Sequence, residues 1–291
     1  MSAAYTVQDS LQPNRVPIAT LISVYGGDSP EHFGVALSSV LQQDVDSTIE
    51  SRIYLGVDGP VPDAIDALIA QHADQLFLVY RAARNSGLAR TLNELISRLR
   101  DEEFVFRMDA DDIALPQRYR YQLNYLRQHL EIDILGTAIT EFDEVSGEEH
   151  VVHFSRGPED AVARIHKRVP VAHPSVCIRR RVFRAIPGYP TYGTNEDVAL
   201  WFECVAQGFR FDNLPDSLLR FRVSGTFWKR RGVHKAFSEL TCYLRGIRAV
   251  RGLLTLDYLY PVMRFLLRLS PTFVSRLAYR SSFRRVETPT S

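Results

Sequence analysis

The chain has 291 residues, 45% of them hydrophobic and 24% charged, which is typical of a globular protein with one large domain or with one domain and appendages. Its formal net charge of +1 argues against a nucleic-acid-binding protein, and its three cysteines are too widely spaced for a zinc knuckle or a disulfide framework. Residues 1–17 lack the pattern of a signal peptide and no apolar run is long enough to span a membrane, so we expect a cytoplasmic protein.

The first half of the chain alternates strand and helix patterns with short connections. Residues 1–16 are polar, and we expect them to be loose. Ser29 and Pro30 together predict a capped helix start. Apolar patterns predict strands at 17–25, 52–57, 76–80 and from 104, and helices at 30–41, 62–71, 88–99 and 116–129. This repeat predicts an α/β fold whose mostly parallel sheet carries helices on both faces.

After residue 136 the strands and helices no longer alternate regularly. Strands are expected at 138–142, 150–154, 173–178, 209–211 and 218–223, with helices at 158–167 and from Glu196. Residues 187–195 are rich in Gly, Pro and Tyr and predict an exposed loop. We therefore expect a loose segment at 1–16, one domain at 17–232 and a helical tail at 233–291.

Three carboxylates, Asp109, Asp111 and Asp112, follow directly after the apolar run that starts at Phe104. Asp favours turns over strands, so these side chains should lie just past the carboxyl end of a buried strand. Crowded carboxylates repel one another unless a cation lies between them, and oxygen ligands suit Mg²⁺ or Mn²⁺. The alternative is a solvated acidic turn without a metal.

Two further loops should meet the acidic loop at the same edge of the sheet. Tyr25 ends the first predicted strand and Asp58 the second. In open α/β sheets the carboxyl ends of parallel strands form the ligand-binding edge. A carboxylate there can accept an N–H from a nucleobase and a tyrosine can pack on its ring. Taken alone, the segment at Asp58 would be a plain turn.

Other polar residues each allow two interpretations. Asp197, with Glu196, begins a helix behind the glycine-rich loop, where it could be a general base or a helix cap. His173 is either a metal ligand or a histidine satisfied in the core. Arg230 and Arg231 either hold phosphate or are simply solvated.

The tail is basic and amphipathic. From Leu240 onward it holds nine arginines against Asp257 and Glu287, with apolar and aromatic residues between them. A helix of this composition can lie in the headgroup plane of an anionic membrane, or it can pack its apolar face on the main domain.

In their order and spacing, these segments resemble the family 2 nucleotide-sugar glycosyltransferases with the GT-A fold, especially transferases of bacterial capsule and exopolysaccharide synthesis. The similarity extends over residues 18–232. It rests on Ile22–Tyr25 with Ala36–Gln43, Arg84–Leu88 with Leu92–Asn93, Arg107–Asp112 with Pro116 and Arg118, His173–Ser175, Gly188–Tyr189, Glu196–Asp197 with Leu200–Trp201, and Arg222 with Arg230–Gly232.

The resemblance implies a Rossmann-like sheet, a nucleotide-binding half at 17–136 and an acceptor-binding half at 137–232. It implies Mg²⁺ or Mn²⁺ as cofactor and inverting transfer of a sugar, with a UDP-sugar favoured as donor and a saccharide hydroxyl, on a lipid-linked oligosaccharide, as acceptor. The implied roles are nucleotide-sugar binding by Ser23, Tyr25, Asp58, Asp109, Arg230 and Arg231, metal binding by Asp109, Asp111 and His173, acceptor binding by Glu196 and Trp201, and base catalysis by Asp197.

Two positions depart from the family pattern. Gly26 follows Tyr25 where the family has Asn, and Val57 precedes Asp58 where the family has a second Asp. These differences concern which base is bound. Two other functions remain open from the sequence: a metal-dependent phosphohydrolase or nucleotidyltransferase, which would not need Asp197, and a non-catalytic nucleotide-sugar-binding protein.

Overall fold

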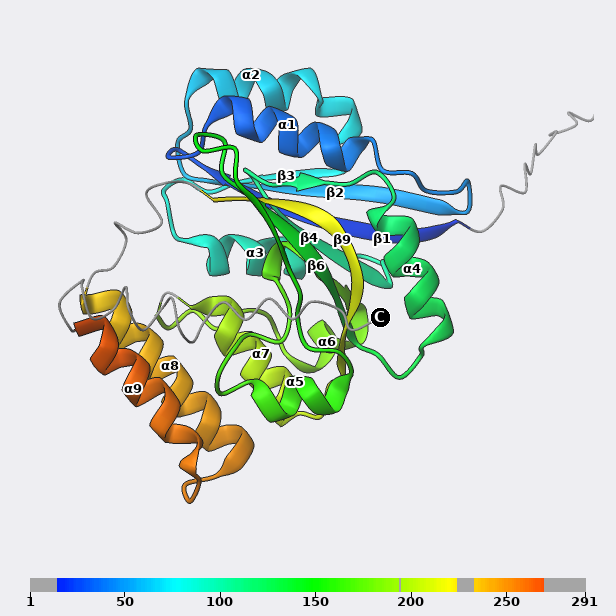
Figure 1. Ribbon diagram of the computed structural model, residues 1–291. Coiled ribbons are helices and arrows are strands. Elements are labelled where there is room, and N and C mark those ends of the chain that lie inside the picture. The colour runs from blue at the N-terminus through cyan, green and yellow to red at the C-terminus, as the bar shows by residue number, and fades with distance from the viewer. Residues whose placement is uncertain (1–14, 194, 224–232, 270–291) are drawn as a thin grey trace, which may run out of the picture.

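A single sheet of nine strands forms the centre of the computed structural model, which describes residues 15–193, 195–223 and 233–269. The strand order is β3-β2-β1-β4-β8-β6-β9-β5, and β7 pairs with β6 outside this path. Helices lie on both sides of the sheet (Figure 1). Within the described residues, no helix combines the length and the hydropathy needed to cross a bilayer.

The first half of the sheet is parallel. Its strands are β1 (Val16–Tyr25), β2 (Ile49–Asp58), β3 (Leu78–Arg81) and β4 (Phe104–Asp109). Helices α1 (Pro30–Leu41) and α2 (Asp63–Gln71) cover one face, and α3 (Leu88–Ser97) covers the other. The predicted start of α1 is confirmed, because the Ser29 side chain accepts a hydrogen bond from the N–H of His32. The α/β fold with helices on both faces is therefore confirmed.

The second half of the sheet mixes strand directions. Strand β6 (Ile134–Phe142) pairs parallel with β9 (Phe211–Arg222) and antiparallel with β7 (Glu149–Val152) and β8 (Cys177–Arg179), while β5 (Ile113–Ala114) pairs with β9. The remaining elements here are α4 (Arg118–Gln128), α5 (Pro158–Arg164), α6 (Arg180–Ala185), α7 (Glu196–Ala206), and the short 3₁₀ turns η1 (Ala73–Gln75) and η2 (His173–Ser175).

Three of the expected strands have boundaries in the structure that differ from the predicted ones. The strand predicted at 173–178 begins as the turn η2, because Pro174 has no N–H to give to a ladder, and only Cys177–Arg179 pairs. The two strands predicted at 209–223 are one strand, β9. Its register against β6 shifts where Pro215 and Asp216 are skipped, so the sequence pattern is interrupted although the strand continues.

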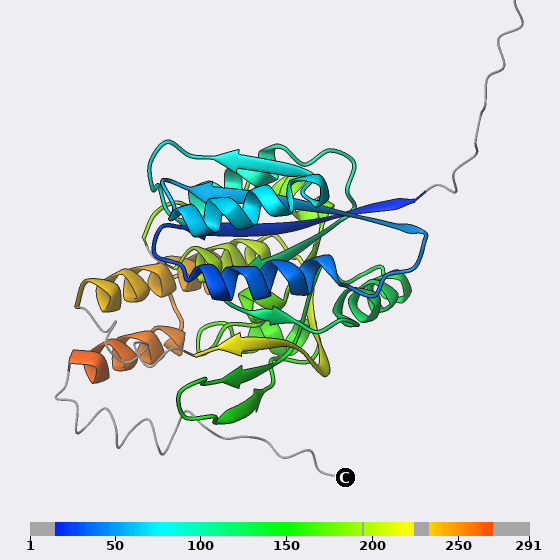
Figure 2. The ribbon, with the colours of Figure 1, turned by 90° about the horizontal axis from the view of Figure 1, so that it is seen from above.

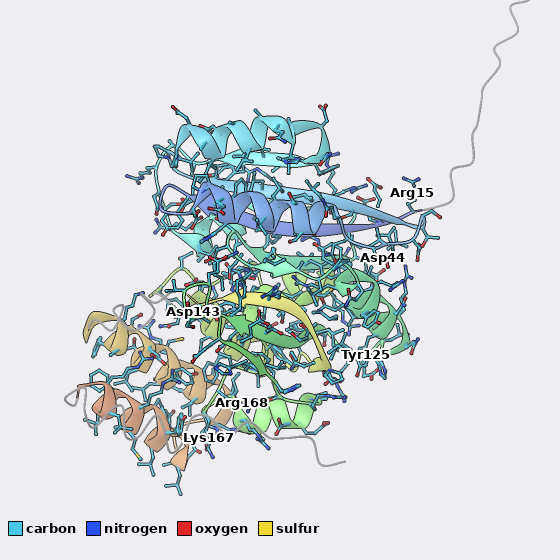
Figure 3. All side chains as sticks on the ribbon, turned by 45° about the horizontal axis from the view of Figure 1, so that its top comes forward. Arg15, Asp44, Tyr125, Asp143, Lys167 and Arg168 are labelled. Atoms are coloured by element: carbon cyan, nitrogen blue, oxygen red, sulfur yellow. The ribbon has the colours of Figure 1, made fainter. Side chains whose placement is uncertain are left out.

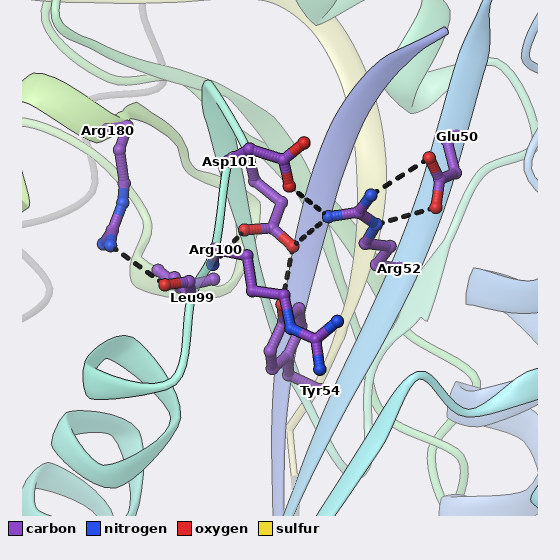
Figure 4. Close-up of polar contacts among 8 residues, drawn as sticks. Glu50, Arg52, Tyr54, Leu99, Arg100, Asp101 and Arg180 are labelled. Atoms are coloured by element: carbon purple, nitrogen blue, oxygen red, sulfur yellow. Dashed lines mark hydrogen bonds and ion pairs between the residues drawn. The ribbon is translucent and has the colours of Figure 1, made fainter.

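The amino end of the parallel sheet is closed by a charged network (Figure 4). Arg52 on β2 donates to Glu50 and Asp101, and also to Glu102 at 3.0 Å. The hydroxyl of Tyr54 donates to the same Glu102 carboxylate at 2.5 Å. Since the Glu102 side chain is fully buried, these donors replace the water it has lost. Arg15 and Asp44 lie at this end of the molecule, whereas Asp143, just after β6, lies at the opposite end (Figure 3).

The C-terminal part of the described chain is a helical hairpin of α8 (Val233–Arg251) and α9 (Leu259–Leu269), joined through the turn η4 (Leu256–Tyr258). It projects from the end of the molecule toward which β1 runs (Figures 1 and 2). Helix α8 packs against α7, where the ring of Phe202 stacks edge-on with Tyr243 and lies against Gly246. The expected domain boundary near 232 falls outside the described residues.

Replacing Gly246 with alanine is expected to lower the free energy of unfolding by up to about 2 kcal/mol. A Cβ at Gly246 would lie 2.1 Å from Phe202 Cγ, and such overpacking typically costs about 1–3 kcal/mol, against a gain of about 1 kcal/mol in helix propensity. Gly34→Ala on α1 is the matched control, because its Cβ would meet Leu68 at an ordinary 3.5 Å. Urea unfolding measures both; equal stability of the two variants would contradict the close α7–α8 packing.

Candidate active site

The carboxyl ends of β1, β2 and β4 bring the predicted residues side by side. In the sheet, Ser23 is the register partner of Asp109, and Tyr25 is the register partner of Asp58. The sequence-based expectation that these strand ends converge is therefore confirmed as geometry. Tyr25 is 42% exposed, so its ring is available to a ligand.

The three carboxylates after β4 form one cluster. Asp109, Asp111 and Asp112 each offer an oxygen, and these oxygens lie within 4.8 Å of one another. Burial raises the pKa of Asp111, and the neighbouring Asp109 raises it further. Burial and Asp109 also raise the pKa of Asp112 well above its usual value. One Asp112 oxygen, Oδ2, meets no hydrogen-bond partner among the described residues. An all-oxygen donor set that repels itself fits a divalent cation.

Arg107 supplies the positive charge beneath this cluster. Its side chain is only 3% exposed and forms an ion pair with Asp109. Its Nε and Nη1 atoms find no hydrogen-bond acceptor in the described parts of the chain. The Arg107 charge also lowers the pKa of Asp111 and Asp197, so it lies between the acidic loop and α7. Arg107 contributed to the family resemblance, but no role was predicted for it. Its position as a charged residue within the apolar run of β4 could have marked it as a functional candidate.

Arg222, at the end of β9, holds the acidic loop from the second half of the sheet. Its backbone N–H donates to Asp112 Oδ1 at 2.9 Å, and its Nε donates to the backbone oxygen of Asp111 at 2.7 Å. Its guanidinium also forms an ion pair with Glu144. The loop conformation is thus fixed by a strand that lies more than 100 residues later in the chain.

A fourth carboxylate, Asp28, lies close to this edge of the sheet, although no role was predicted for it from the sequence. It accepts a hydrogen bond from the N–H of Tyr25 at 3.0 Å. Burial raises the pKa of Asp28 to about 6, with smaller contributions from the negative charges of Asp111 and Asp109. It therefore lies near the cluster. Asp28 could have been recognised from the sequence as a candidate, because it is an acidic residue three positions after the end of β1.

Asp58 makes contacts that sequence reasoning did not foresee. Its side chain is 3% exposed and accepts hydrogen bonds from the N–H groups of Ser86, at 2.7 Å, and Gly87, at 2.9 Å. These bonds fix the turn that leads into α3. Gly59 allows the close approach, because it has φ of 85° and a Cβ there would lie 2.5 Å from the Asn85 nitrogen. A direct contact of Asp58 with a nucleobase stays a prediction.

Asp197 lies in the first turn of α7, near Arg107. Burial raises the pKa of Asp197 to about 6, and the adjacent Glu196 raises it further, against a hydrogen bond from the Val198 N–H and the charge of Arg107. A carboxyl with a pKa of about 6 is mostly ionised at neutral pH, yet it binds a proton more strongly than an ordinary aspartate does. Its raised pKa therefore suits the expected general base.

His173 and Trp201 lie deeper than their predicted roles require. His173 is not part of the carboxylate cluster, and its Nε2 is hydrogen bonded to the hydroxyl of Tyr189 at 2.8 Å. Burial, and then Arg107, lower the pKa of His173 well below its usual value. Trp201 is fully buried beneath it, with the ring centroids 5.9 Å apart. Metal binding by Nε2 of His173 would require the Tyr189 bond to break, and Trp201 would have to leave the core to touch an acceptor.

The predicted phosphate-binding residues Arg230 and Arg231 lie outside the described residues. All other predicted site residues lie in the described parts of the chain.

The chain is similar to known proteins over most of its length. Residues 22–186 match the family model described as Glycosyl transferase family 2. The amylovoran biosynthesis glycosyltransferase AmsE of Erwinia amylovora is 32% identical over 90% of this chain and 97% of its own length. The UDP-Gal:alpha-D-GlcNAc-diphosphoundecaprenol beta-1,3-galactosyltransferase of Escherichia coli is 26% identical over 92% of this chain and 96% of its own length.

Solved structures share the fold at low sequence identity. S. aureus TarS in complex with UDP-GlcNAc has a TM-score of 0.64 at 17% identity, over 92% of this chain and 76% of that one; a longer TarS structure matches over 46% of its own length. The mannosyltransferase PcManGT from Pyrobaculum calidifontis, in complex with GDP-Man and Mn²⁺, has a TM-score of 0.62 at 14% identity, over 94% of this chain and 78% of its own.

Mn²⁺ is expected to raise the unfolding temperature of the wild-type chain and to have no effect on Asp111→Asn, since a ligand that binds only the folded state stabilises it. Without metal, Asp111→Asn should be at least as stable as wild type. The pKa of Asp111 is raised in the folded state, so its ionised form costs stability at neutral pH, and Asn removes that cost.

Asp101→Asn is the matched control for this thermal-shift experiment. It makes the same charge change far from the cluster, at a carboxylate whose pKa is lowered by Arg52. It should keep the full Mn²⁺ response. An equal Mn²⁺ response in Asp111→Asn and Asp101→Asn would contradict the metal site.

Proposed function

The chain belongs to glycosyltransferase family 2 and has the GT-A fold, and we propose from this that it catalyses inverting transfer of a sugar from a nucleotide-diphosphate sugar to a saccharide hydroxyl. The observation that carries the proposal is the single group formed by the carboxylate cluster, Arg107 and Asp197. It combines a place for a metal-bound diphosphate with a carboxylate of raised pKa a short distance away.

A UDP-sugar is the favoured donor. Among the similar proteins, one is named for UDP-Gal and another is solved with UDP-GlcNAc, whereas a third is solved with GDP-Man. In the proposed complex the exposed ring of Tyr25 packs on the base, with Ser23 beside it, and Arg230 and Arg231 hold the diphosphate.

The proposed acceptor is a lipid-linked oligosaccharide in the synthesis of a bacterial surface polysaccharide. Support comes from relatives named for amylovoran biosynthesis and for a diphosphoundecaprenol-linked sugar. Such an acceptor is anchored in the membrane, so the proposal includes a cytoplasmic enzyme that docks at the inner membrane face. Glu196, next to the base, is the residue on α7 best placed to meet the acceptor.

Asp109 and Asp111 would hold Mg²⁺ or Mn²⁺, which when bound neutralises the charge that develops on the leaving diphosphate. Arg107 holds Asp109 in place through their ion pair. Asp197 removes the proton from the attacking hydroxyl, which approaches the anomeric carbon opposite the leaving group. A single displacement of this kind converts an α-linked donor into a β-glycoside.

A hydrolase or nucleotidyltransferase that uses only the acidic loop would have no use for Asp197. Family membership and the raised pKa of Asp197 both favour glycosyl transfer over that alternative. A non-catalytic binding protein would likewise have no use for a buried carboxylate with a raised pKa.

Asp197→Asn is expected to reduce kcat by about two to four orders of magnitude, the usual size of a general-base contribution, with donor affinity unchanged. In the wild type, kcat/KM should rise with pH through a pKa of about 6, because only the ionised carboxylate accepts a proton. Glu196→Gln should move this inflection to lower pH, since the charge of Glu196 raises the pKa of Asp197.

Turnover with radiolabelled UDP-sugars across pH 4.5–8 tests these expectations. Equal losses of donor binding and turnover in Asp197→Asn would instead indicate a structural role. An inflection that stays in place in Glu196→Gln would show that a different group titrates.

A further inference from the structure

Helix α9 exposes an apolar stripe of the kind that a surface helix normally buries. Leu259, Val262, Met263 and Leu266 are 58%, 38%, 60% and 59% exposed. At about 100° per residue they lie on one stripe roughly 100° wide. Its arginines point the other way, toward α8, where Arg264 reaches Glu239 at 2.8 Å and Arg268 pairs with the same carboxylate.

The connector between α8 and α9 extends the same apolar surface. Leu253, Leu254 and Leu256 are 68%, 100% and 80% exposed. The connector is nevertheless held in one shape, because the Thr255 side chain caps η4 and the hydroxyl of Tyr258 donates to the Gly252 carbonyl at 2.8 Å. The connector and the α9 stripe form an exposed apolar ridge of seven residues: Leu253, Leu254, Leu256, Leu259, Val262, Met263 and Leu266.

Exposed apolar surface of this extent indicates a partner, and the charge around it identifies the class of partner. Residues 233–269 hold six Lys and Arg against two acids, and the segment that follows adds four Arg against one Glu. A second copy of the chain would bring two positive hairpins together, which is repulsive. An anionic lipid surface instead accepts the ridge and attracts its basic surroundings.

We propose that the apolar ridge inserts into the headgroup region of an anionic bilayer and that this contact orients the catalytic site. Helix α8 packs on α7, and Cys242 on α8 donates to the Asn195 carbonyl, two residues before Asp197. The hairpin lies at the end of the molecule toward which β1 runs, the same end as the acidic loop (Figures 1 and 2). The biological reason for docking rests on the proposed lipid-linked acceptor. The evidence for docking, which is the exposed ridge and its basic surroundings, does not rest on that proposal.

Co-flotation of the full chain with vesicles tests this inference. The ridge variant Leu254→Asp/Met263→Asp is compared with Leu130→Asp/Val145→Asp, whose leucine and valine are 68% and 95% exposed elsewhere on the surface. Both variants change the net charge equally, so only the place of the change differs. The probe is phosphatidylglycerol/phosphatidylcholine vesicles, with pure phosphatidylcholine vesicles in parallel.

Wild type and the control variant should float with the anionic vesicles in a salt-sensitive way, and the ridge variant should lose at least about tenfold in the bound-to-free ratio, since each inserted apolar group contributes to partitioning. Equal flotation of the two variants, or no flotation of the wild type, would overturn the proposal. A dimer in light scattering that only the ridge variant dissociates would also overturn it, in favour of a second copy.

The same preparations separate this inference from the proposed function. UDP with Mn²⁺ should raise the unfolding temperature of wild type and of both variants equally, which also confirms that the variants are folded. Loss of the UDP response in every preparation would contradict the proposed function and leave the docking result intact.

Discussion

The structure of the site depends on a single electrostatic problem at the end of β4. Three carboxylates follow one another over four positions, and Arg107, buried beneath them, balances only part of their charge through Asp109. Burial, and after it the repulsion from Asp109, raises the pKa of Asp111 and Asp112. A divalent cation bound at this cluster would relieve the remaining repulsion.

Both halves of the sheet supply contacts that position the carboxylate cluster. The parallel half delivers the strand ends in register, so that Ser23 lies beside Asp109. The mixed half supplies Arg222, whose hydrogen bonds to Asp111 and Asp112 fix the loop. The position of Asp197 comes from a third source, the packing of α7 against α8. The site is thus an assembly of distant segments whose relative placement the whole fold determines.

The sequence predicted what local patterns control. Apolar runs marked the parallel strands, Ser29 and Pro30 marked α1, and the rule for parallel sheets brought Tyr25 and Asp109 to one edge. It could not reveal properties set by long-range packing. The capping role of Asp58, the proximity of Asp28 to the cluster and the Arg222 contacts depend on residues far away in the chain. The arginines of α9 point inward because they pair with Glu239 on α8, and this pairing could not be predicted from the sequence of α9 alone.

Inversion at the anomeric carbon is the central chemical claim, and it can be tested without knowing the acceptor. Slow hydrolysis of an α-linked UDP-sugar, with water as the attacking hydroxyl, can be followed by time-resolved proton NMR with diamagnetic Mg²⁺ present. The account predicts that the first free sugar to appear is the β-anomer, before mutarotation mixes the two forms, and that Asp197→Asn abolishes this signal. Initial release of the α-anomer would contradict a single displacement assisted by Asp197.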